Sequence, residues 1–414
     1  MSYRTLLPLV VLALLVGCDA AGLSDTPALE SGAAPEADVA LASLPDRPNA
    51  KGDDQPAGRP ADVIPDQYIV VFNDGVADVP GLAKRLAQGG SLLYTYESAI
   101  EGFAVRLPEA AVAALRNHPL VASVEPDQEV RVGATQTIGA SGDPWGLDRL
   151  NQRARPLDRQ YTYTYTGSGV RVYVIDTGLQ ANHPQFGGRA QNVYDAFGGN
   201  GADCNGHGTH VAGTVGGSTY GVAKQALLRG VKVLDCAGSG STSGIIAAVD
   251  WVRQNAQKPA VANLSLGGGY SSALNTAVNN LANAGIFTAV AAGNENQNAC
   301  NVSPASASFA FTTAASTKTD GRATYSNYGT CVDAYAPGSA IQSAWIGSGV
   351  LTIDGTSMAS PHVAGVAALV KHRYGDVSSA SITNYLIDNS TANVITGNPS
   401  GTPNRLLYKF QTAL

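Results

Sequence analysis

The chain has 414 residues and a formal net charge of −6 at pH 7, from 32 acidic and 26 basic side chains. This length exceeds one average domain, so a sizeable core and two or three folded units are possible. The chain has no basic surplus and no basic block, which argues against nucleic acid or an anionic membrane surface as a partner.

The first segment, residues 1–18, has the pattern of an export signal. Arg4 is followed by an apolar run (6–16) that ends close to Cys18. The run is too short to remain in a bilayer as a spanning helix, so we expect the protein to leave the cytoplasm. Residues 15–18 also resemble a bacterial lipobox, in which the Cys is lipidated after cleavage. An ordinary signal peptide that contains a Cys is the alternative.

Two segments of different character follow the signal. Residues 19–65 are rich in Ala, Pro, Asp and Gly, bury too little apolar surface to fold, and are predicted to be a disordered linker. Residues 66–133 are predicted to form a small α+β domain, which is marginal alone and would be steadier on a larger one. Its expected strands are 67–72, 102–107 and 121–124, and its expected helices are 81–88 and 108–116.

The remaining residues, 134–414, alternate short β-branched runs with amphipathic segments. Strands are expected at 170–175, 227–234, 261–266 and 286–291, and helices at 243–256 and 274–284. This alternation predicts an α/β fold with a doubly wound, mainly parallel sheet. Functional groups of such sheets gather at the carboxyl ends of the strands.

Asp176 directly follows the first of these strands, in the sequence Asp-Thr-Gly. A turn residue after a strand is the simplest alternative to a functional role. Aspartic proteases also use Asp-Thr-Gly, but they need two carboxylates that share a proton, and the chain has no second Asp-Thr-Gly or Asp-Ser-Gly.

His207 lies in NGHGTHVAGT (205–214), where small residues allow a loop to turn tightly into a helix. An imidazole there is accessible to a neighbour. It could instead cap the helix, lie in solvent, or form a His-x-x-His metal pair with His210. The metal pair lacks the Glu that a hydrolytic zinc site needs between its histidines.

Ser357 lies in DGTSMASPHVAG (354–365), before an apolar stretch at helical spacing, 358–370. It is therefore predicted at a helix N-terminus, where free N–H groups and the helix dipole can stabilise an oxyanion. Taken alone, a Ser at this position is usually only a cap.

The three motifs together are more specific than any one of them. A serine hydroxyl is a poor nucleophile until a base removes its proton, and the imidazole needs a carboxylate to fix its tautomer. Asp176, His207 and Ser357 supply these parts in the chain order of subtilisin.

Residues 144–410 resemble the subtilisin-like proteases, and within them the proteinase K and aqualysin group. The resemblance implies a secreted serine endopeptidase that forms an acyl-enzyme on Ser357, with His207 as general base, Asp176 as orienting carboxylate and Asn294 as oxyanion donor. Its motifs are VIDTG (174–178), NGHGTHVAGT (205–214), NLSLGGG (263–269), AVAAGNEN (289–296) and DGTSMASPHVAGVAAL (354–369).

The resemblance also implies how a substrate binds. Two extended segments flank the peptide as strands and supply main-chain hydrogen bonds, and the family favours an apolar or aromatic side chain before the scissile bond. The matching residues are Gly238, Ser239 and Gly240 in one segment and Ser265, Leu266 and Gly267 in the other.

Export to an oxidising compartment makes disulfides the default use of the cysteines. Setting Cys18 aside leaves four, which allow three connectivities, and no Cys-x-x-Cys pair supports a zinc site. The resemblance to aqualysin-type enzymes implies Cys204–Cys236 and Cys300–Cys331.

Structural calcium is a further implication of the resemblance. One family site matches the Asp333 carboxylate with the backbone carbonyls of Ser308 and Ala310. A second would use Asp148, Gln152 and Asp158, but Asn151 stands where a relative has Asp, so that site lacks one negative charge.

The small domain, 66–133, resembles the inhibitory propeptide of the same superfamily in strand order and position. This implies a chaperone that covers the active cleft and is removed by self-cleavage between Val132 and Gly142. We expect a monomer whose partners are peptide substrates and its own propeptide, with membrane contact only through a lipid on Cys18 of the precursor. A catalytically silent binding protein and a metal or aspartic hydrolase are the rival functions.

Overall fold

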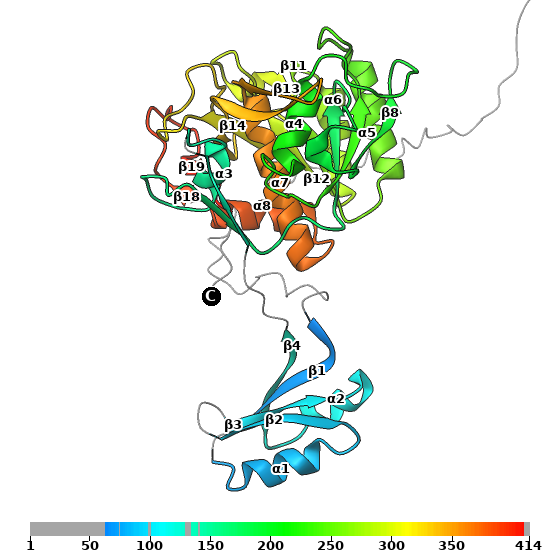
Figure 1. Cartoon of the computed structure of the whole chain (residues 1–414), viewed down its shortest axis with the longest axis vertical. Helices are drawn as coiled ribbons and strands as arrows, with labels where there is room; N and C mark the ends of the chain where they lie inside the picture. Colours follow the sequence, from blue (N-terminus) through cyan, green and yellow to red (C-terminus); the bar gives the residue numbers. More distant parts are fainter. Residues whose placement is uncertain (1–62, 74, 98–100, 129–133, 140, 410–414) are drawn as a thin grey trace, which may run out of the picture. The chain divides into compact units, whose positions relative to one another are not determined.

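The computed structural model describes residues 63–73, 75–97, 101–128, 134–139 and 141–409 (Figure 1). The predicted signal, Cys18, most of the linker and part of the expected cleavage region lie outside these ranges. Within them, no helix is long and apolar enough to cross a membrane.

Residues 63–128 contain a four-stranded antiparallel sheet with two helices, α1 (Val79–Leu86) and α2 (Glu109–Arg116). Alternate residues of the first strand, such as Val70 and Phe72, pack with Phe103 in one core. The predicted α+β character is confirmed. In the order β2-β3-β1-β4, the strands are β2 (Ser91–Glu97), β3 (Glu101–Arg106), β1 (Val63–Phe72) and β4 (Val121–Gln128).

Several bounds in this unit differ from the sequence expectation: α1 begins two residues earlier than expected, and β4 ends four residues later. β1 begins at Val63, inside the segment predicted as linker, and β2 was not predicted at all. The residues of β2 are exposed or half-buried on both faces, so they lack the apolar alternation that marks a strand with one buried face.

The larger sheet has nine strands in the order β18-β19-β15-β14-β12-β10-β7-β9-β8. All neighbouring pairs are parallel except β18–β19, which confirms the predicted mainly parallel sheet. The strands are β7 (Arg171–Asp176), β8 (Ala190–Asp195), β9 (Leu227–Lys232), β10 (Ala260–Leu264), β12 (Phe287–Ala291), β14 (Phe311–Ser316), β15 (Ala334–Pro337), β18 (Thr391–Ala392) and β19 (Arg405–Leu406).

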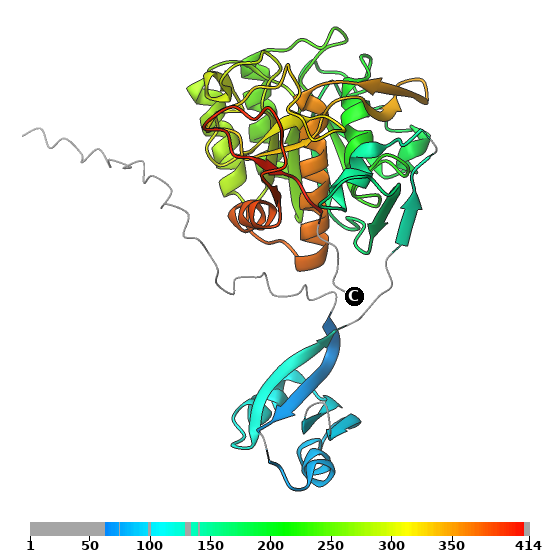
Figure 2. The same ribbon diagram turned by 90° about the vertical axis from the view of Figure 1, so that its left-hand side faces the viewer.

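Helices cover both faces of this sheet. Val172 and Val174 of β7 belong to the core beneath α4 (His207–Gly216) and α7 (Thr356–Tyr374). Tyr173 and Ile175 belong to the core beneath α5 (Thr242–Asn255) and α6 (Ser272–Asn283). Figure 2 shows α7, in orange, as the long helix of its layer. Burial on both faces explains why residues 172–175 of β7 are all hydrophobic.

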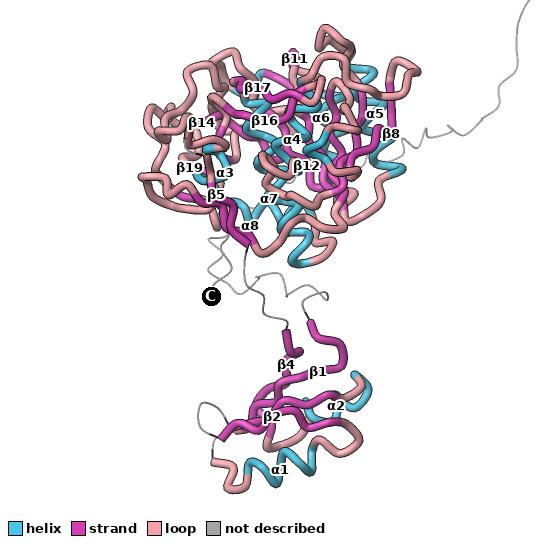
Figure 3. The backbone as a smooth tube through the Cα atoms, in the orientation of Figure 1, coloured by secondary structure: helices cyan, strands magenta, loops and turns pink. Residues whose placement is uncertain are grey.

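Shorter elements surround the sheet. An antiparallel hairpin of β16 (Ile341–Trp345) and β17 (Gly349–Ile353) contacts α4 through β16 and leads directly into α7 (Figure 3). A last helix, α8 (Ser379–Asp388), contacts α7. The others are α3 (Trp145–Leu150), β5 (Ala134–Thr137), β6 (Gln160–Tyr163), η1 (Pro184–Phe186), β11 (Gly268–Gly269), η2 (Ala299–Asn301) and β13 (Val302–Ser303).

The direction of winding reverses at β7. The chain places β8 and β9 on one side of β7, then returns to place β10, β12, β14 and β15 on the other. In open α/β sheets, ligands bind beyond the carboxyl ends of the strands at such a switch point. The residues that follow β7, β9, β10 and β12 are therefore the ones to inspect.

Both disulfides expected from the family resemblance are present. Cys204 pairs with Cys236 and Cys300 pairs with Cys331, with Cα atoms 4.9 and 5.4 Å apart. The first bridge joins the loop before α4 to the segment after β9, so it lies at the same edge of the sheet as the predicted site.

Candidate active site

Asp176 and His207 form a close pair at the carboxyl end of β7. Asp176 is the last residue of the strand and fully buried, and its Oδ1 lies 2.7 Å from Nδ1 of His207, the first residue of α4. The same oxygen accepts a hydrogen bond from the backbone N–H of Thr177 at 2.7 Å. The imidazole side chain is 26% exposed, so its other edge remains accessible.

The surroundings favour the charged form of His207. Burial acts to lower its pKa, but the charge of Asp176, the hydrogen bond to Asp176 and the charge of Asp203 together outweigh burial and raise the pKa above 6.5. This imidazole is therefore a stronger base than a free histidine.

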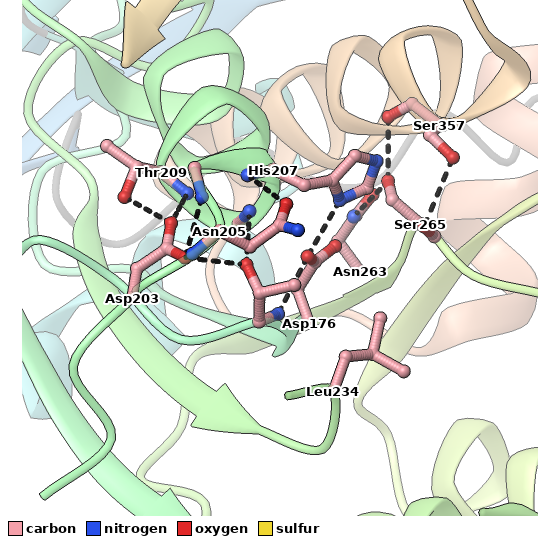
Figure 4. A network of polar contacts seen from close by, with 12 residues as sticks. Asp176, Asp203, Asn205, His207, Thr209, Leu234, Asn263, Ser265 and Ser357 are labelled. Carbon is pink, nitrogen blue, oxygen red and sulfur yellow. Dashed lines mark hydrogen bonds and ion pairs between the residues drawn. The ribbon is translucent and has the colours of Figure 1, made fainter. Parts of the chain in front are cut away.

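Ser357 is the second residue of α7, as the sequence predicted for a helix N-terminus. Its Oγ donates a hydrogen bond to the backbone oxygen of Ser265 at 3.1 Å, and Ser265 Oγ donates to the backbone oxygen of Ser357 at 2.8 Å. In the view of Figure 4, the His207 ring lies between Asp176 and Ser357. The structure thus brings all three residues to one edge, with the serine hydroxyl bound to Ser265.

Asn294 follows β12 by three residues and is aimed by Thr356. Its Oδ1 accepts hydrogen bonds from the backbone N–H of Thr356 at 2.8 Å and from Thr356 Oγ1 at 2.9 Å. Within the described part of the chain, Nδ2 has no protein acceptor. A Cβ placed on Gly355 would lie 3.6 Å from Ser357 N and 3.7 Å from Asn294 Nδ2, so two N–H donors border one small space.

A cleft of about 560 Å³ adjoins His207. Both segments expected to hold a substrate line it, the first including Gly238, Ser239 and Gly240 and the second including Ser265, Leu266 and Gly267. Its apolar lining also includes Leu234, Ile245 and Leu274. The two segments follow β9 and β10, on either side of β7 in the sheet.

The residues expected to hold calcium fall into two groups. Asp333 Oδ2 accepts a hydrogen bond from the backbone N–H of Thr312 at 2.9 Å, which places its carboxylate beside the segment that contains Ser308 and Ala310. No cluster of three or more His, Cys, Asp or Glu side chains suited to a metal occurs among the described residues.

The second group is Asp148, Gln152 and Asp158. Asp148 is 1% exposed, and its Oδ1 is buried without a hydrogen-bond partner. Burial raises the pKa of Asp148 to about 6, and the neighbouring Asp158 adds to this rise. Gln152 Oε1 accepts from the backbone N–H of Asp158 at 3.1 Å, so the three residues are linked. Two adjacent carboxylates with an unpaired buried oxygen fit a cation, despite Asn151.

Sequence reasoning missed two residues that organise the site. Thr356 orients Asn294, and Asp203 receives hydrogen bonds from the turn before α4. Both lie close to recognised motifs, Thr356 inside one and Asp203 two residues before another. That proximity was the only signal available, since neither side chain takes part in the chemistry inferred from the motifs.

Family models and known proteins match this chain over most of its length. The Subtilase family model matches residues 167–406, and the Peptidase inhibitor I9 model matches residues 67–133. An extracellular serine proteinase of Thermus sp. (strain Rt41A) is 48% identical over 84% of this chain and 90% of its own sequence. A cuticle-degrading protease of Metarhizium anisopliae is 45% identical over 84% and 90%, respectively.

A solved structure is also similar. The crystal structure of a cold adapted subtilisin-like serine proteinase superposes with a TM-score of 0.64 at 51% sequence identity, covering 65% of this chain and 98% of that one.

Proposed function

The chain belongs to the subtilase family and is a serine-type endopeptidase with an I9-type propeptide, and we propose that Ser357, His207 and Asp176 are its catalytic triad. The observation that carries the proposal is the 2.7 Å contact between Asp176 Oδ1 and His207 Nδ1. This contact fixes the tautomer that leaves Nε2 free to accept a proton.

In the proposed reaction, Ser357 Oγ attacks the scissile carbonyl carbon while His207 Nε2 takes the hydroxyl proton. The tetrahedral intermediate collapses as His207 returns the proton to the leaving amine, which leaves an acyl-enzyme on Ser357. Water then repeats the sequence and releases the acid. Asn294 Nδ2 and the Ser357 N–H would hold the oxyanion, and their unpaired donors around Gly355 support this role.

We assign peptide binding to the two segments that line the cleft, 238–240 and 265–267. Their glycines allow a substrate backbone to approach closely and pair as an added strand, which recognises main chain rather than sequence. The apolar side chains in the lining support a preference for apolar or aromatic residues, including the one before the scissile bond.

We also propose that calcium binds to stabilise the fold. Asp333 with the carbonyls of Ser308 and Ala310 would hold one ion, and Asp148, Gln152 and Asp158 would hold another. A bound cation would neutralise the buried Asp148 carboxylate, whose pKa of about 6 reflects its cost in the apo form.

The precursor is proposed to have four parts: a signal at 1–18, a linker at 19–65, an inhibitory propeptide at 66–133 and a peptidase at 134–414. Relatives of the chain are extracellular proteases, and we propose that the mature enzyme is likewise secreted as a monomer. A lipid on Cys18 would anchor only the precursor.

The test compares the exported wild type with Ser357→Ala by intact mass and N-terminal sequence. Wild type should lose everything before about residue 134, and the variant should keep its propeptide because it cannot cut itself. Ser381→Ala, a change on the exposed part of α8, is the matched control and should mature normally. If Ser357→Ala matures like wild type and also hydrolyses peptides, the triad is wrong. If wild type hydrolyses no peptide, the chain is a silent binding protein.

A further inference from the structure

The carboxylate of Asp203 supports the turn that precedes His207. Its Oδ1 accepts from the backbone N–H groups of Asn205 at 3.0 Å and Gly206 at 2.9 Å, and its Oδ2 accepts from N and Oγ1 of Thr209 at 2.9 and 2.6 Å (Figure 4). Gly206, at the N-cap of α4, has no side chain with which to cap the helix. Asp203 therefore supplies the cap and faces the positive end of the helix dipole.

The same carboxylate also holds the end of β7. Asp203 Oδ1 accepts a hydrogen bond from Thr177 Oγ1 at 2.9 Å, and Thr177 Oγ1 accepts from the backbone N–H of Gly208 at 2.8 Å. Thr177 directly follows Asp176. One side chain thus joins the strand end that presents the carboxylate to the helix that presents the imidazole.

We propose that Asp203 is a positioning residue of the peptidase, which fixes the turn carrying His207 and places a second negative charge near this imidazole. The inference rests on the proposed role of His207 as general base. It adds a residue that does not line the cleft, yet contributes with Asp176 to the pH at which the base becomes available.

The electrostatics around His207 are consistent with this role. Burial has the largest effect on the pKa of His207 and opposes the charged form, and the two residues that raise this pKa are Asp176 and Asp203. The same helix, α4, contributes His210 and the neighbouring α7 contributes His362, and burial lowers the pKa of each to about 4, so both are neutral near pH 7. Lys232, at the end of β9, donates to the Thr177 oxygen at 2.7 Å and is not among the charges that act on His207.

The test is the pH dependence of kcat/KM for Asp203→Asn. The amide keeps the size of the side chain and one acceptor oxygen but removes the charge. Since the charge of Asp203 raises the pKa of His207, its loss should move the acid limb of the pH profile to lower pH. Asp195→Asn is the matched control, because Asp195 also accepts from two backbone N–H groups of its loop, Phe197 and Gly201 at 2.9 Å each, but is not among the charges that act on His207.

Two further experiments separate the effect of the Asp203 charge from its effect on the orientation of His207. In 1 M salt, the shift in Asp203→Asn should persist, because screening weakens interactions between exposed charges far more than local, half-buried ones. Thr209→Val removes one donor to Asp203 and keeps the charge, so it should lower kcat several-fold without moving the acid limb. This variant also serves if Asp203→Asn fails to mature.

Defined outcomes would overturn the inference. The inference fails if the acid limb stays in place in Asp203→Asn or if it moves equally in Asp195→Asn. It also fails if the limb moves in Thr209→Val as it does in Asp203→Asn. Labelling of wild type with a serine-directed phosphonate distinguishes failure of the proposed function from failure of the proposed role of Asp203. If wild type is not labelled at Ser357, the proposed function fails; if it is labelled and Asp203→Asn keeps the wild-type limb, only the role of Asp203 fails.

Discussion

Replacing Thr356 by Val tests how the amide of Asn294 is aimed at the developing oxyanion. Thr356 Oγ1 donates to Asn294 Oδ1 at 2.9 Å and accepts from the backbone N–H of Gly293 at 3.0 Å. Asn294 Oδ1 keeps one further donor, the backbone N–H of Thr356 at 2.8 Å. Valine preserves the shape of the side chain, so the change removes one of the two contacts that orient the amide and leaves Gly293 without this acceptor.

The expected loss follows from the size of one hydrogen bond. Losing a net contribution of about 0.5–1.5 kcal/mol from the transition state corresponds to a fall in kcat of about 2- to 13-fold. The unpaired Gly293 N–H costs stability in the ground state and the transition state alike, so it adds little to this fall. KM should change little, because the Asn294 amide acts on the charge that develops only in the transition state. Thr288→Val is the control, since Thr288 is a buried threonine of β12 whose Oγ1 donates to the Ile286 oxygen.

The assay is a double-mutant cycle on chromogenic peptide hydrolysis with Thr356→Val, Asn294→Leu and the combination. In subtilisin, a member of the family, loss of the side-chain oxyanion donor costs about 2.7–4 kcal/mol. If Thr356 acts through Asn294, adding Thr356→Val to Asn294→Leu should cost little more. Fully additive losses, or a rise in KM with kcat unchanged, would refute this reasoning.

Three other perturbations follow from the structure. Burial lowers the pKa of His210 and His362 to about 4, so the unfolded chain binds more protons than the folded chain below pH 6.5. The free energy of unfolding should therefore fall between pH 6.5 and 4, by roughly 3 kcal/mol for each imidazole. Equal urea midpoints at pH 7 and pH 5 would contradict this. Chelation should lower the melting temperature of wild type, by the equivalent of about 2.7 kcal/mol if calcium had stood at a hundred times its Kd, and less so in Asp333→Asn; equal effects in both proteins would remove Asp333 from the ligand set. Replacing Cys204 and Cys236 together by Ser should cost about 3–4 kcal/mol of stability, measured by urea unfolding, because the bridge closes a separation of 32 residues; an unchanged midpoint would show that the bridge adds nothing.

The fold could be predicted where burial leaves a pattern in the sequence. β7, β9, β10 and β12 are buried on both faces, so their β-branched runs were recognised within a few residues of their bounds. β8, β14 and β15 were missed, although β14 (FTTAAS) is buried throughout. Its small and hydroxylated residues match no apolar run, because close packing against α7 selects small side chains there.

The catalytic candidates could be named because their motifs carry constraints from the backbone as well as from chemistry. Gly208 shows this, since a Cβ at that position would lie 2.2 Å from the Gly178 oxygen, so glycine is required where α4 approaches the end of β7. The motifs around Asp176 and His207 therefore record the contact between two elements. A pattern of that kind identifies the residues, but it does not give the distance that makes them a pair.

The residues that position the triad could not be named, because no specific sequence motif marks their contacts. Asp203 accepts backbone N–H groups two, three and six residues ahead, and an Asp before a Gly-rich turn is common wherever a helix begins. Only its added bond to Thr177, a residue that precedes it by 26 positions, sets it apart from an ordinary cap. That bond depends on β7 ending beside the start of α4, which is a property of the assembled sheet. The triad motifs can thus be recognised from the sequence alone, whereas the residues that position the triad can be identified only in the folded structure, where β7 ends beside the start of α4.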